Sequence, residues 1–296
     1  MMHPATRLKE FIHNKKILVM PGAYDALSAR LIERAGFDAI QISGYGLSAS
    51  YLGMTDASFT NLTDVFTITK NIANAVEIPV MTDADTGYGN AVNTAWTIRQ
   101  LGLAGAAGAN LEDQVFPKIC GNLEGKALIS MEEMVGKIRA AVDHKTHPDF
   151  VINARTDAVG VTGLEDAIRR GNAYAEAGAD MIYISSPPSV EIIKTLVKKI
   201  NAPISINMRE GGLTPDLTVK EFEELGVARL SVPLTTMFAA ARGVEQALNH
   251  LKENGTAEHY DGLMSFEELN VITDEKLIRC QEKKYGVQRE PYNSAE

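Results

Sequence analysis

The sequence predicts a (β/α)₈ barrel of the TIM type, an α/β fold, from a recurring helix-to-strand motif and from eight apolar runs distributed along the chain. In this motif, a helical pattern ends at small residues and a short apolar run follows directly. The motif occurs as "ERAGFDAIQIS", "RQLGLAGAAGANLED", "AEAGADMIYIS" and "EELGVARLSV". Glycine at a helix end followed directly by a buried strand is typical of βαβ units.

The other four strands are predicted from the runs ILVM (17–20), IPVMTD (78–83), FVINAR (150–155) and APISIN (202–207). Together the eight strands begin near residues 17, 39, 79, 106, 150, 180, 203 and 227, and a helical pattern follows each of them. The runs are too apolar to alternate, as expected of parallel strands buried on both faces. Eight units in about 250 residues favour a closed barrel. A doubly wound open sheet is the alternative.

The regular repeat ends near residue 252. We therefore expect a catalytic barrel over residues 1–252 and a helical C-terminal extension over 253–296, with a helical segment at 264–284. Residues 234–284 carry more apolar helical surface than a barrel of this length can cover, which predicts an oligomer.

Composition excludes several classes of protein. With 29 basic and 38 acidic residues the net charge is −9, and no basic stripe is present, which argues against nucleic acid and anionic membranes as partners. No apolar run reaches the roughly 18 residues of a membrane span. The opening MMHPATRLKEFIHNKK lacks the apolar core of a signal peptide, so a cytoplasmic protein is expected. Cys120 and Cys280 are too few for a disulfide framework and are expected to be free thiols.

A barrel of this type has its active site at the C-terminal ends of its strands. Carboxylates dominate the middle of these ends and an arginine follows, which indicates a site for a hard cation and an anionic ligand. The strand ends read "SGYG" (43–46), "TDADTGYG" (82–89), "NLEDQ" (110–114), "NARTD" (153–157), "ISS" (184–186) and "NMREGG" (207–212).

The acidic residues indicate a metal. Asp83 and Asp85 are one residue apart at a strand end, and Glu112 and Asp113 end the next strand. Carboxylates this close repel one another unless a cation neutralises them, and oxygen ligands suit Mg²⁺ or Mn²⁺. The alternative is that each Asp caps a helix or forms an Asx turn. Acidic pairs on neighbouring strands favour the metal.

Arg155 ends its strand inside an apolar run, which favours bidentate capture of a carboxylate or phosphonate over a surface salt bridge. The glycines of "SGYG" and "NMREGG" would allow close backbone approach to an anion, although glycine pairs are more often plain turns.

The segment "FPKICGNLEGKALIS" is predicted to be a long loop over the barrel mouth, and such loops are often lids. Lys118 beside Cys120 would favour the thiolate, which could act as a base or proton donor. The alternative is that Cys120 packs as a small apolar residue, and this is the preferred interpretation for Cys280.

Taken together, "SGYG", "TDADTGYG", "LEDQVFPKICG", "NART" and "NMREGG" resemble the isocitrate lyase / phosphoenolpyruvate mutase superfamily over residues 5–260. The chain is most similar to its short members, which include 2-methylisocitrate lyases, 2,3-dimethylmalate lyases, oxaloacetate-cleaving hydrolases and carboxyvinyl-carboxyphosphonate phosphorylmutases. The resemblance implies a Mg²⁺-dependent barrel whose last helix is swapped between subunits, usually in homotetramers.

The resemblance also implies roles for individual residues. Asp83 would bind Mg²⁺ directly, and Asp56, Asp85 and Glu112 would act through metal-bound water. Lys118 and Cys120 would lie on a gating loop, with Cys120 protonating the departing carbanion and Tyr45 beside the reacting groups. The small 2-hydroxy or 2-keto acid would be bound by Ser43, Gly44, Tyr45, Gly121, Asn122, Arg155 and Asn207.

Three features of the sequence depart from the lyase pattern. Asn122 and Asn110 stand where lyases usually carry histidines, and Ser185 and Ser186 stand where methylisocitrate lyases tend to carry a Glu. Mutases and phosphonopyruvate hydrolases lack the loop cysteine, so Cys120 favours C–C cleavage. The predicted function is a Mg²⁺-dependent lyase that cleaves a 2-alkylmalate or 2-alkylisocitrate to a keto acid and a carboxylate.

Four alternatives remain open from the sequence. Two are other reactions of the resembling family, namely phosphonate P–C bond chemistry and oxaloacetate cleavage. A third is a catalytically inactive barrel kept for binding, which the intact acidic cluster disfavours. The fourth is a Schiff-base aldolase using Lys118, which is disfavoured because a lysine on a mobile loop lacks the desolvation that lowers its pKa.

Overall fold

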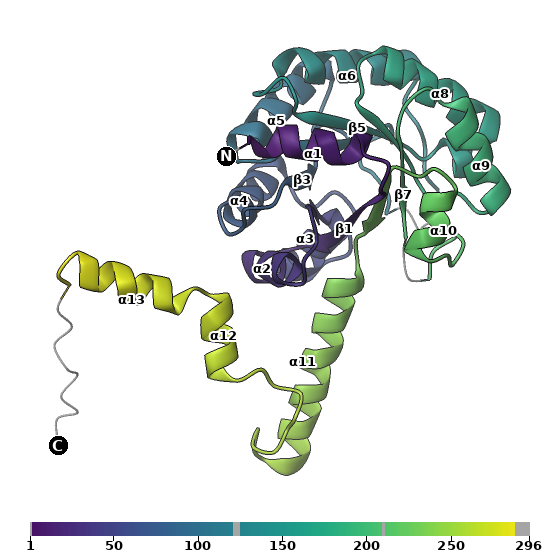
Figure 1. The fold of residues 1–296 in the computed structure, drawn as a ribbon. Helices are drawn as coiled ribbons and strands as arrows, with labels where there is room; N and C mark the ends of the chain where they lie inside the picture. The colour runs from purple at the N-terminus through teal and green to yellow at the C-terminus, as the bar shows by residue number, and fades with distance from the viewer. Residues whose placement is uncertain (1, 121–124, 209–210, 288–296) are drawn as a thin grey trace, which may run out of the picture. The chain divides into compact units, whose positions relative to one another are not determined.

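The computed structural model describes residues 2–120, 125–208 and 211–287 (Figure 1). Eight parallel strands close in sequence order into a barrel, as predicted. Pairing of Leu18 with Arg229 joins the first strand to the last and excludes the open sheet. The strands are β1 (Leu18–Ala23), β2 (Ile40–Ile42), β3 (Val80–Asp83), β4 (Gly108–Glu112), β5 (Val151–Thr156), β6 (Met181–Ile184), β7 (Ile204–Asn207) and β8 (Arg229–Val232).

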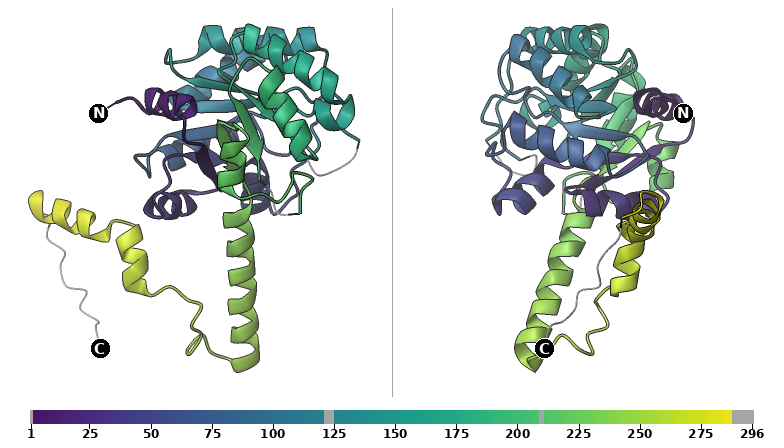
Figure 2. Two further views of the ribbon diagram at one scale, coloured as in Figure 1. Left: turned by 45° about the vertical axis from the view of Figure 1, so that its right-hand side comes forward. Right: turned by 90° about the vertical axis from the view of Figure 1, so that its left-hand side faces the viewer.

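Helices follow the strands around the outside of the barrel (Figure 2). Most begin at a polar residue whose side chain accepts a backbone N–H of the first turn, as Asp25, Asn61, Asn90, Ser130, Ser189 and Thr218 do. The main outer helices are α2 (Ala26–Arg34), α4 (Leu62–Ala73), α5 (Ala91–Leu103), α6 (Met131–His144), α8 (Leu164–Glu176), α9 (Val190–Lys199) and α10 (Val219–Glu224). Shorter pieces follow strands β2 and β5, namely α3 (Gly44–Leu47), the π-helix η1 (Ser48–Leu52) and α7 (Ala158–Val161).

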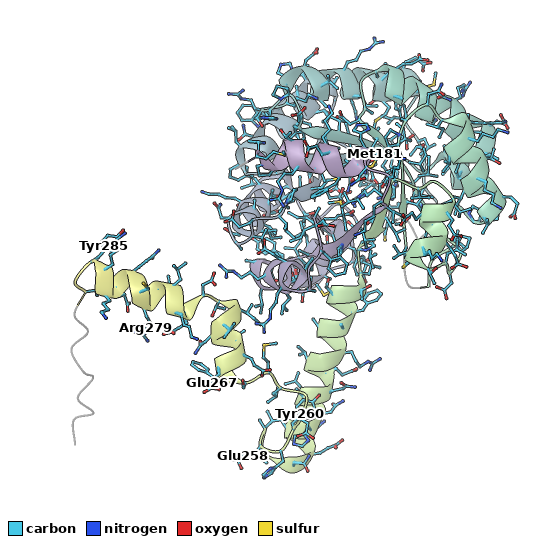
Figure 3. The ribbon with its side chains drawn as sticks, in the orientation of Figure 1. Met181, Glu258, Tyr260, Glu267, Arg279 and Tyr285 are labelled. Atoms are coloured by element: carbon cyan, nitrogen blue, oxygen red, sulfur yellow. The ribbon has the colours of Figure 1, made fainter. Side chains whose placement is uncertain are left out.

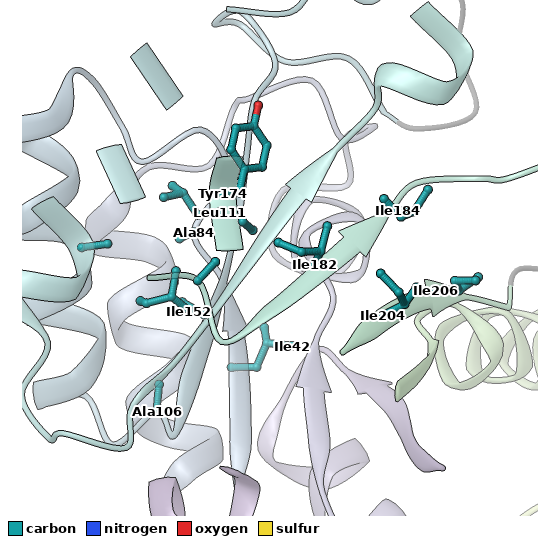
Figure 4. Packing of buried hydrophobic residues seen from close by; sticks show 14 of the residues in the cluster. Ile42, Ala84, Ala106, Leu111, Ile152, Tyr174, Ile182, Ile184, Ile204 and Ile206 are labelled. Carbon is teal, nitrogen blue, oxygen red and sulfur yellow. The ribbon is translucent and has the colours of Figure 1, made fainter. Parts of the chain in front are cut away.

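Two apolar cores hold the barrel. Residues on the outer face of the strands pack against the helices, and Figure 4 shows Ile152, Ile182 and Ile204 of this cluster on neighbouring strands. Inside the barrel, α1 (Pro4–His13) contributes Leu8 to a second cluster that contains Met20, Met81 and Met181. Since residues of a strand alternate between faces, one strand supplies both cores. The apolar cluster around α1, called the apolar plug below, fills the N-terminal end of the barrel. The polar residues of the candidate site lie at the opposite end, where the strands end.

The chain divides into two compact units, Met1–Ala239 and Ala240–Glu296, and the boundary between them falls inside α11 (Thr235–Asn254). The second unit contains the predicted extra helices, α12 (Phe266–Ile272) and α13 (Glu275–Lys284). Figure 3 labels Tyr260 in the connection after α11 and Arg279 on α13. Among the residues described, no helix is long and apolar enough to cross a membrane.

Candidate active site

A cavity of about 280 Å³ opens among residues at the C-terminal ends of the strands, where the barrel was expected to bind its ligand. Eight of the predicted site residues line it, namely Ser43, Gly44, Tyr45, Asp56, Asp83, Cys120, Arg155 and Asn207. Asn110 and Ser185, which depart from the lyase pattern, also line it. Gly121 and Asn122 lie outside the described residues.

Lys118 holds the acidic residues together. Its ammonium nitrogen lies 2.8 Å from Asp56 Oδ2 and 2.8 Å from Asp85 Oδ1, and its side chain is 3% exposed. Burial alone would lower the pKa of Lys118, but the charges of Asp85, Glu112 and Asp56 outweigh it and hold this pKa well above its usual value. The expected reason against a Schiff base, a solvated lysine, is therefore wrong, because Lys118 is buried. It is nevertheless a poor nucleophile, since it stays protonated.

The carboxylates around Lys118 are buried or, at Asp83, partly buried, and those of Glu112 and Asp85 are incompletely satisfied. Burial, reinforced by the neighbouring Asp85, raises the pKa of Asp83, and burial also raises the pKa of Glu112 despite the adjacent Arg155. Glu112 Oε1 has no hydrogen-bond partner among the described residues, and Asp85 Oδ1 has only the ion pair with Lys118. Buried carboxylate oxygens without donors are costly unless a cation satisfies them. This donor set therefore fits a hard divalent ion.

The acidic side chains do not converge as a ready-made metal cluster. Within the described part of the chain, no three Asp, Glu, His or Cys side chains are grouped closely enough to hold a metal. The reason lies in the contacts, because Lys118 spans Asp56 and Asp85 while Arg155 binds Glu112. Within the described residues these carboxylates are therefore paired with Lys118 and Arg155 rather than grouped around one point.

Arg155 is bound more tightly by protein groups than the sequence suggested. Its Nη1 lies 3.0 Å from Glu112 Oε2, its Nε 3.0 Å from Asp157 Oδ2, and its Nη2 3.4 Å from Ser185 Oγ. Lys126 Nζ reaches the other oxygen of Asp157 at 2.7 Å. Two carboxylates thus already share the Arg155 charge, and they fix the plane in which its guanidinium meets the cavity.

The described part of the loop that follows β4 reaches the cavity at Cys120. Its ends are joined by an antiparallel bridge between Gln114 and Leu128. The Gln114 amide accepts a hydrogen bond from Ile119 N at 3.0 Å and donates one to Ile119 O at 3.1 Å. This clamp holds Cys120, a partly buried free thiol, against the cavity. Cys280 is exposed on α13, so the expectation that it packs as an apolar residue fails within this chain.

Asp113 belongs to a structural network. Its Oδ2 accepts hydrogen bonds from Thr156 Oγ1 at 2.7 Å, Tyr174 Oη at 2.8 Å and Arg170 Nη1 at 3.2 Å. Because consecutive strand residues face opposite sides, Glu112 faces the barrel interior while Asp113 faces the helices. The acidic pair seen in the sequence therefore divides into one site residue and one packing residue.

Sequence reasoning missed several residues of the cavity. Gln41 stands two residues before Ser43, and Tyr183 stands two before Ser185, so each shares an inward strand face with a residue that was found. The two-residue period was the signal that could have identified them. Phe238 lines the cavity from α11 and meets Tyr45 edge to face, with ring centroids 6.4 Å apart. No pattern in the sequence indicates that pairing.

Comparison with known proteins identifies the relatives of this site. A sequence profile described as phosphoenolpyruvate phosphomutase matches residues 8–252. The chain is 43% identical over 289 residues to 2,3-dimethylmalate lyase of Eubacterium barkeri, covering 97% of this chain and 100% of the relative. Among solved structures, oxaloacetate acetylhydrolase in complex with the inhibitor 3,3-difluorooxalacetate matches with a TM-score of 0.91 at 32% identity, covering 97% of this chain and 99% of that one. Phosphonopyruvate hydrolase in complex with oxalate and Mg²⁺ matches with a TM-score of 0.88 at 32% identity, covering 96% and 99%.

Proposed function

The chain belongs to the phosphoenolpyruvate mutase/isocitrate lyase superfamily, and from this premise we propose that it is a Mg²⁺-dependent lyase acting on a 2-alkylmalate-type 2-hydroxy acid. It would cleave a C–C bond to give a keto acid and a carboxylate. The observation that carries this proposal is the Cys120 thiol on the wall of a cavity that Asp83 and Asp56 also line. A thiol beside a carboxylate cluster is suited to protonating a carbanion.

Magnesium fits the donors that this chain offers. Asp83, Asp85, Glu112 and Asp56 would hold it, and the unpartnered Glu112 Oε1 supports such a ligand set. The chemistry that Mg²⁺ would supply there is polarisation of the substrate hydroxyl and of the carbonyl that develops from it. A relative, phosphonopyruvate hydrolase, is known with Mg²⁺ and oxalate together.

The other groups of the cavity have separable tasks in the proposed reaction. Ser43 and the side-chain-free Gly44 leave room for the acid beside Asp83, because a Cβ on Gly44 would come within 2.7 Å of Asp83 Oδ2. Asn207 and Arg155 would bind the substrate from the far side of the barrel. The loop that carries Cys120 would exclude water until the carbanion is protonated.

An apolar wall supports an alkylated substrate. Tyr45, Leu234 and Phe238 line one side of the cavity. Ser185, where the lyase pattern tends to have a Glu, adds no charge to the cavity. A methyl or larger alkyl group on the substrate would gain from contact with these side chains, at about 0.8 kcal/mol per buried methylene.

A substrate screen tests the proposal. Synthetic 2-alkylmalates, 2-methylisocitrate, oxaloacetate and phosphonopyruvate are each supplied with Mg²⁺, and keto acid, oxalate and phosphate release are followed. We expect keto acid from an alkylmalate. Turnover of phosphonopyruvate alone would contradict the proposal and support the P–C alternative. Turnover of oxaloacetate alone would support the second candidate, which the structural match to oxaloacetate acetylhydrolase favours.

We also propose that the protein is a homotetramer in which the last barrel helix is swapped between subunits. In α11, none of the residues is buried within this chain, although the helix has 20 residues. Its apolar residues Val244, Leu248 and Leu251 are 60%, 59% and 44% exposed and recur at helical spacing. A second copy of the chain would cover this stripe.

A further inference from the structure

Arg229 is a buried cation without an acidic partner. It begins β8 and is completely buried inside the barrel. The other buried or nearly buried cations, Lys118, Lys137, Arg155 and Arg170, each lie within ion-pair distance of at least one carboxylate. Among the described residues, Arg229 makes no such pair. An uncompensated charge in a protein interior is strongly unfavourable, so its retention requires a reason.

The groups in direct contact with Arg229 are neutral, and the Asp83 carboxylate acts on its charge only from beyond ion-pair distance. Its Nη1 donates to Ser205 Oγ at 2.9 Å, its Nε lies 3.1 Å from Met20 Sδ, and its Nη2 donates to Gln41 Oε1. Burial lowers the pKa of Arg229 to about 10, which leaves the guanidinium charged at neutral pH. The barrel therefore carries a fixed positive charge just above its apolar plug.

Gln41 connects this charge to the cavity. Its Oε1 also accepts a hydrogen bond from Ser231 Oγ at 2.7 Å, so two donors fix which end of the amide carries the oxygen. The Nε2 group is thereby left as a free donor, since no described residue accepts a hydrogen bond from it. Gln41 is 4% exposed and lines the cavity. A buried donor backed by a cation is a built anion subsite.

Gln41 lies deeper in the barrel than the residues expected to bind the keto acid. It stands two residues before Ser43 on the same inward face, which is about 6.6 Å along a strand. The cavity thus has an upper level at Ser43 and a lower level at Gln41. Only a ligand with a second anionic group several atoms from the first could occupy both levels. Arg155 is less suited to that second group, because Glu112 and Asp157 already share its charge.

From this geometry we infer that Gln41, positioned and polarised by Arg229, binds the second carboxylate of the acid at the floor of the cavity. This inference rests on the proposed function, because it assigns one end of the proposed substrate. It makes Gln41 a specificity-determining residue that selects acids whose two carboxylates are several atoms apart over shorter acids. Arg229 is a positioning residue, since it acts through the Gln41 amide.

The test compares two probes that differ in length. Both probes are dicarboxylates. Oxalate, whose carboxylates are directly bonded, is short enough to occupy only the level of Ser43 and Gly44, whereas 3,3-difluorooxaloacetate, called the extended diacid below, has two carbons between its carboxylates and can reach Gln41. Calorimetric titration of the full-length protein in Mg²⁺ buffer gives the affinity for each. In Gln41→Glu a carboxylate replaces the donor, so we expect the extended diacid to bind about 10- to 100-fold more weakly while the affinity for oxalate changes less than threefold.

Stability separates this role from a structural one. The carboxylate introduced in Gln41→Glu would pair with Arg229, so the melting temperature is expected to stay level or rise while the affinity for the extended diacid falls. A purely structural Gln41 would give the opposite result. Gln100→Glu on α5 is the matched control, since it makes the same change in net charge on an outer helix, and both affinities should remain unchanged.

A second variant tests Arg229 directly. Arg229→Met removes the charge and keeps an extended side chain, and we expect the same selective loss of affinity for the extended diacid. If Arg229→Met fails to fold, the affinities of Gln41→Glu for the two probes still test the inference. Equal weakening of both probes in Gln41→Glu, or weakening of neither, would overturn the inference. A parent protein that binds neither probe would overturn it together with the proposed keto-acid site. Probe binding without cleavage of any alkylmalate would count against the proposed reaction alone.

Discussion

Replacing Gly44 by alanine tests whether the position of the Asp83 carboxylate controls activity. A Cβ built on Gly44 would lie 2.7 Å from Asp83 Oδ2, which is 0.7 Å inside the 3.4 Å at which ordinary contact begins. Asp83 must therefore shift by several tenths of an ångström or rotate. Misplacement of a catalytic group by about 1 Å can cost about 100-fold in rate, so we expect kcat/KM to fall about 10- to 100-fold. The apparent affinity for Mg²⁺ should fall with it.

The fold should survive this change. Gly44 opens α3 with no left-handed backbone angle, and alanine is favoured over glycine in helices by up to about 1 kcal/mol, which offsets part of the strain. The measurements are initial rates over a Mg²⁺ series and a thermal melt. Gly136→Ala in α6 is the matched control, because a Cβ there meets nothing within 4 Å, and it should keep full activity. A Gly44→Ala protein with kcat/KM within threefold of the parent would refute the reasoning.

Three further predictions concern the metal, the thiol and the assembly. Asp83→Ala, or excess chelator, should abolish activity because the ion loses its direct ligand; full turnover in chelator would exclude the metal assignment. Cys120→Ser should slow turnover by about 100-fold or more, the scale for a general acid, while keto-acid binding stays nearly constant, and turnover within a few-fold would remove the proton-donor role. Alkylation of Cys120 should slow once ligand is bound. Sedimentation at micromolar concentration should show an oligomer, because the α11 stripe is uncovered in one chain; a monomer would contradict this.

The fold was predictable because its signals are local. Each strand is a short apolar run, and most outer helices begin at a capping residue that can be recognised in the sequence, as Asn61 and Asn90 are. Closure of β1 onto β8 then follows from the number of units. The boundary between the two compact units was less predictable, because α11 runs without interruption through residue 239 and no change in composition marks that point.

Many residues that line the cavity were predictable from the sequence, but the pairings among the polar side chains were not. The strand ends indicated Asp83, Glu112 and Arg155, since a parallel barrel brings its strand ends together. That Lys118 would be buried between Asp56 and Asp85 depends on side chains 62 and 33 residues apart in the sequence. Two-residue periodicity could have added Gln41 and Tyr183, but it gives no reason to select them over other inward positions.

Arg155 and Arg229 differ in how far their charges are neutralised by the protein. From the sequence, Arg155 is the cation that receives an anionic ligand, and Arg229 is one residue of an apolar strand. In the structure Arg155 is matched by Glu112 and Asp157, whereas Arg229 has only neutral contacts. A cation that is already neutralised gains less from a second anion than one that is not, because the favourable interaction scales with the charge that remains. The deeper guanidinium is therefore the stronger source of positive potential for an entering diacid, and the Gln41 amide is the group through which that potential reaches the cavity.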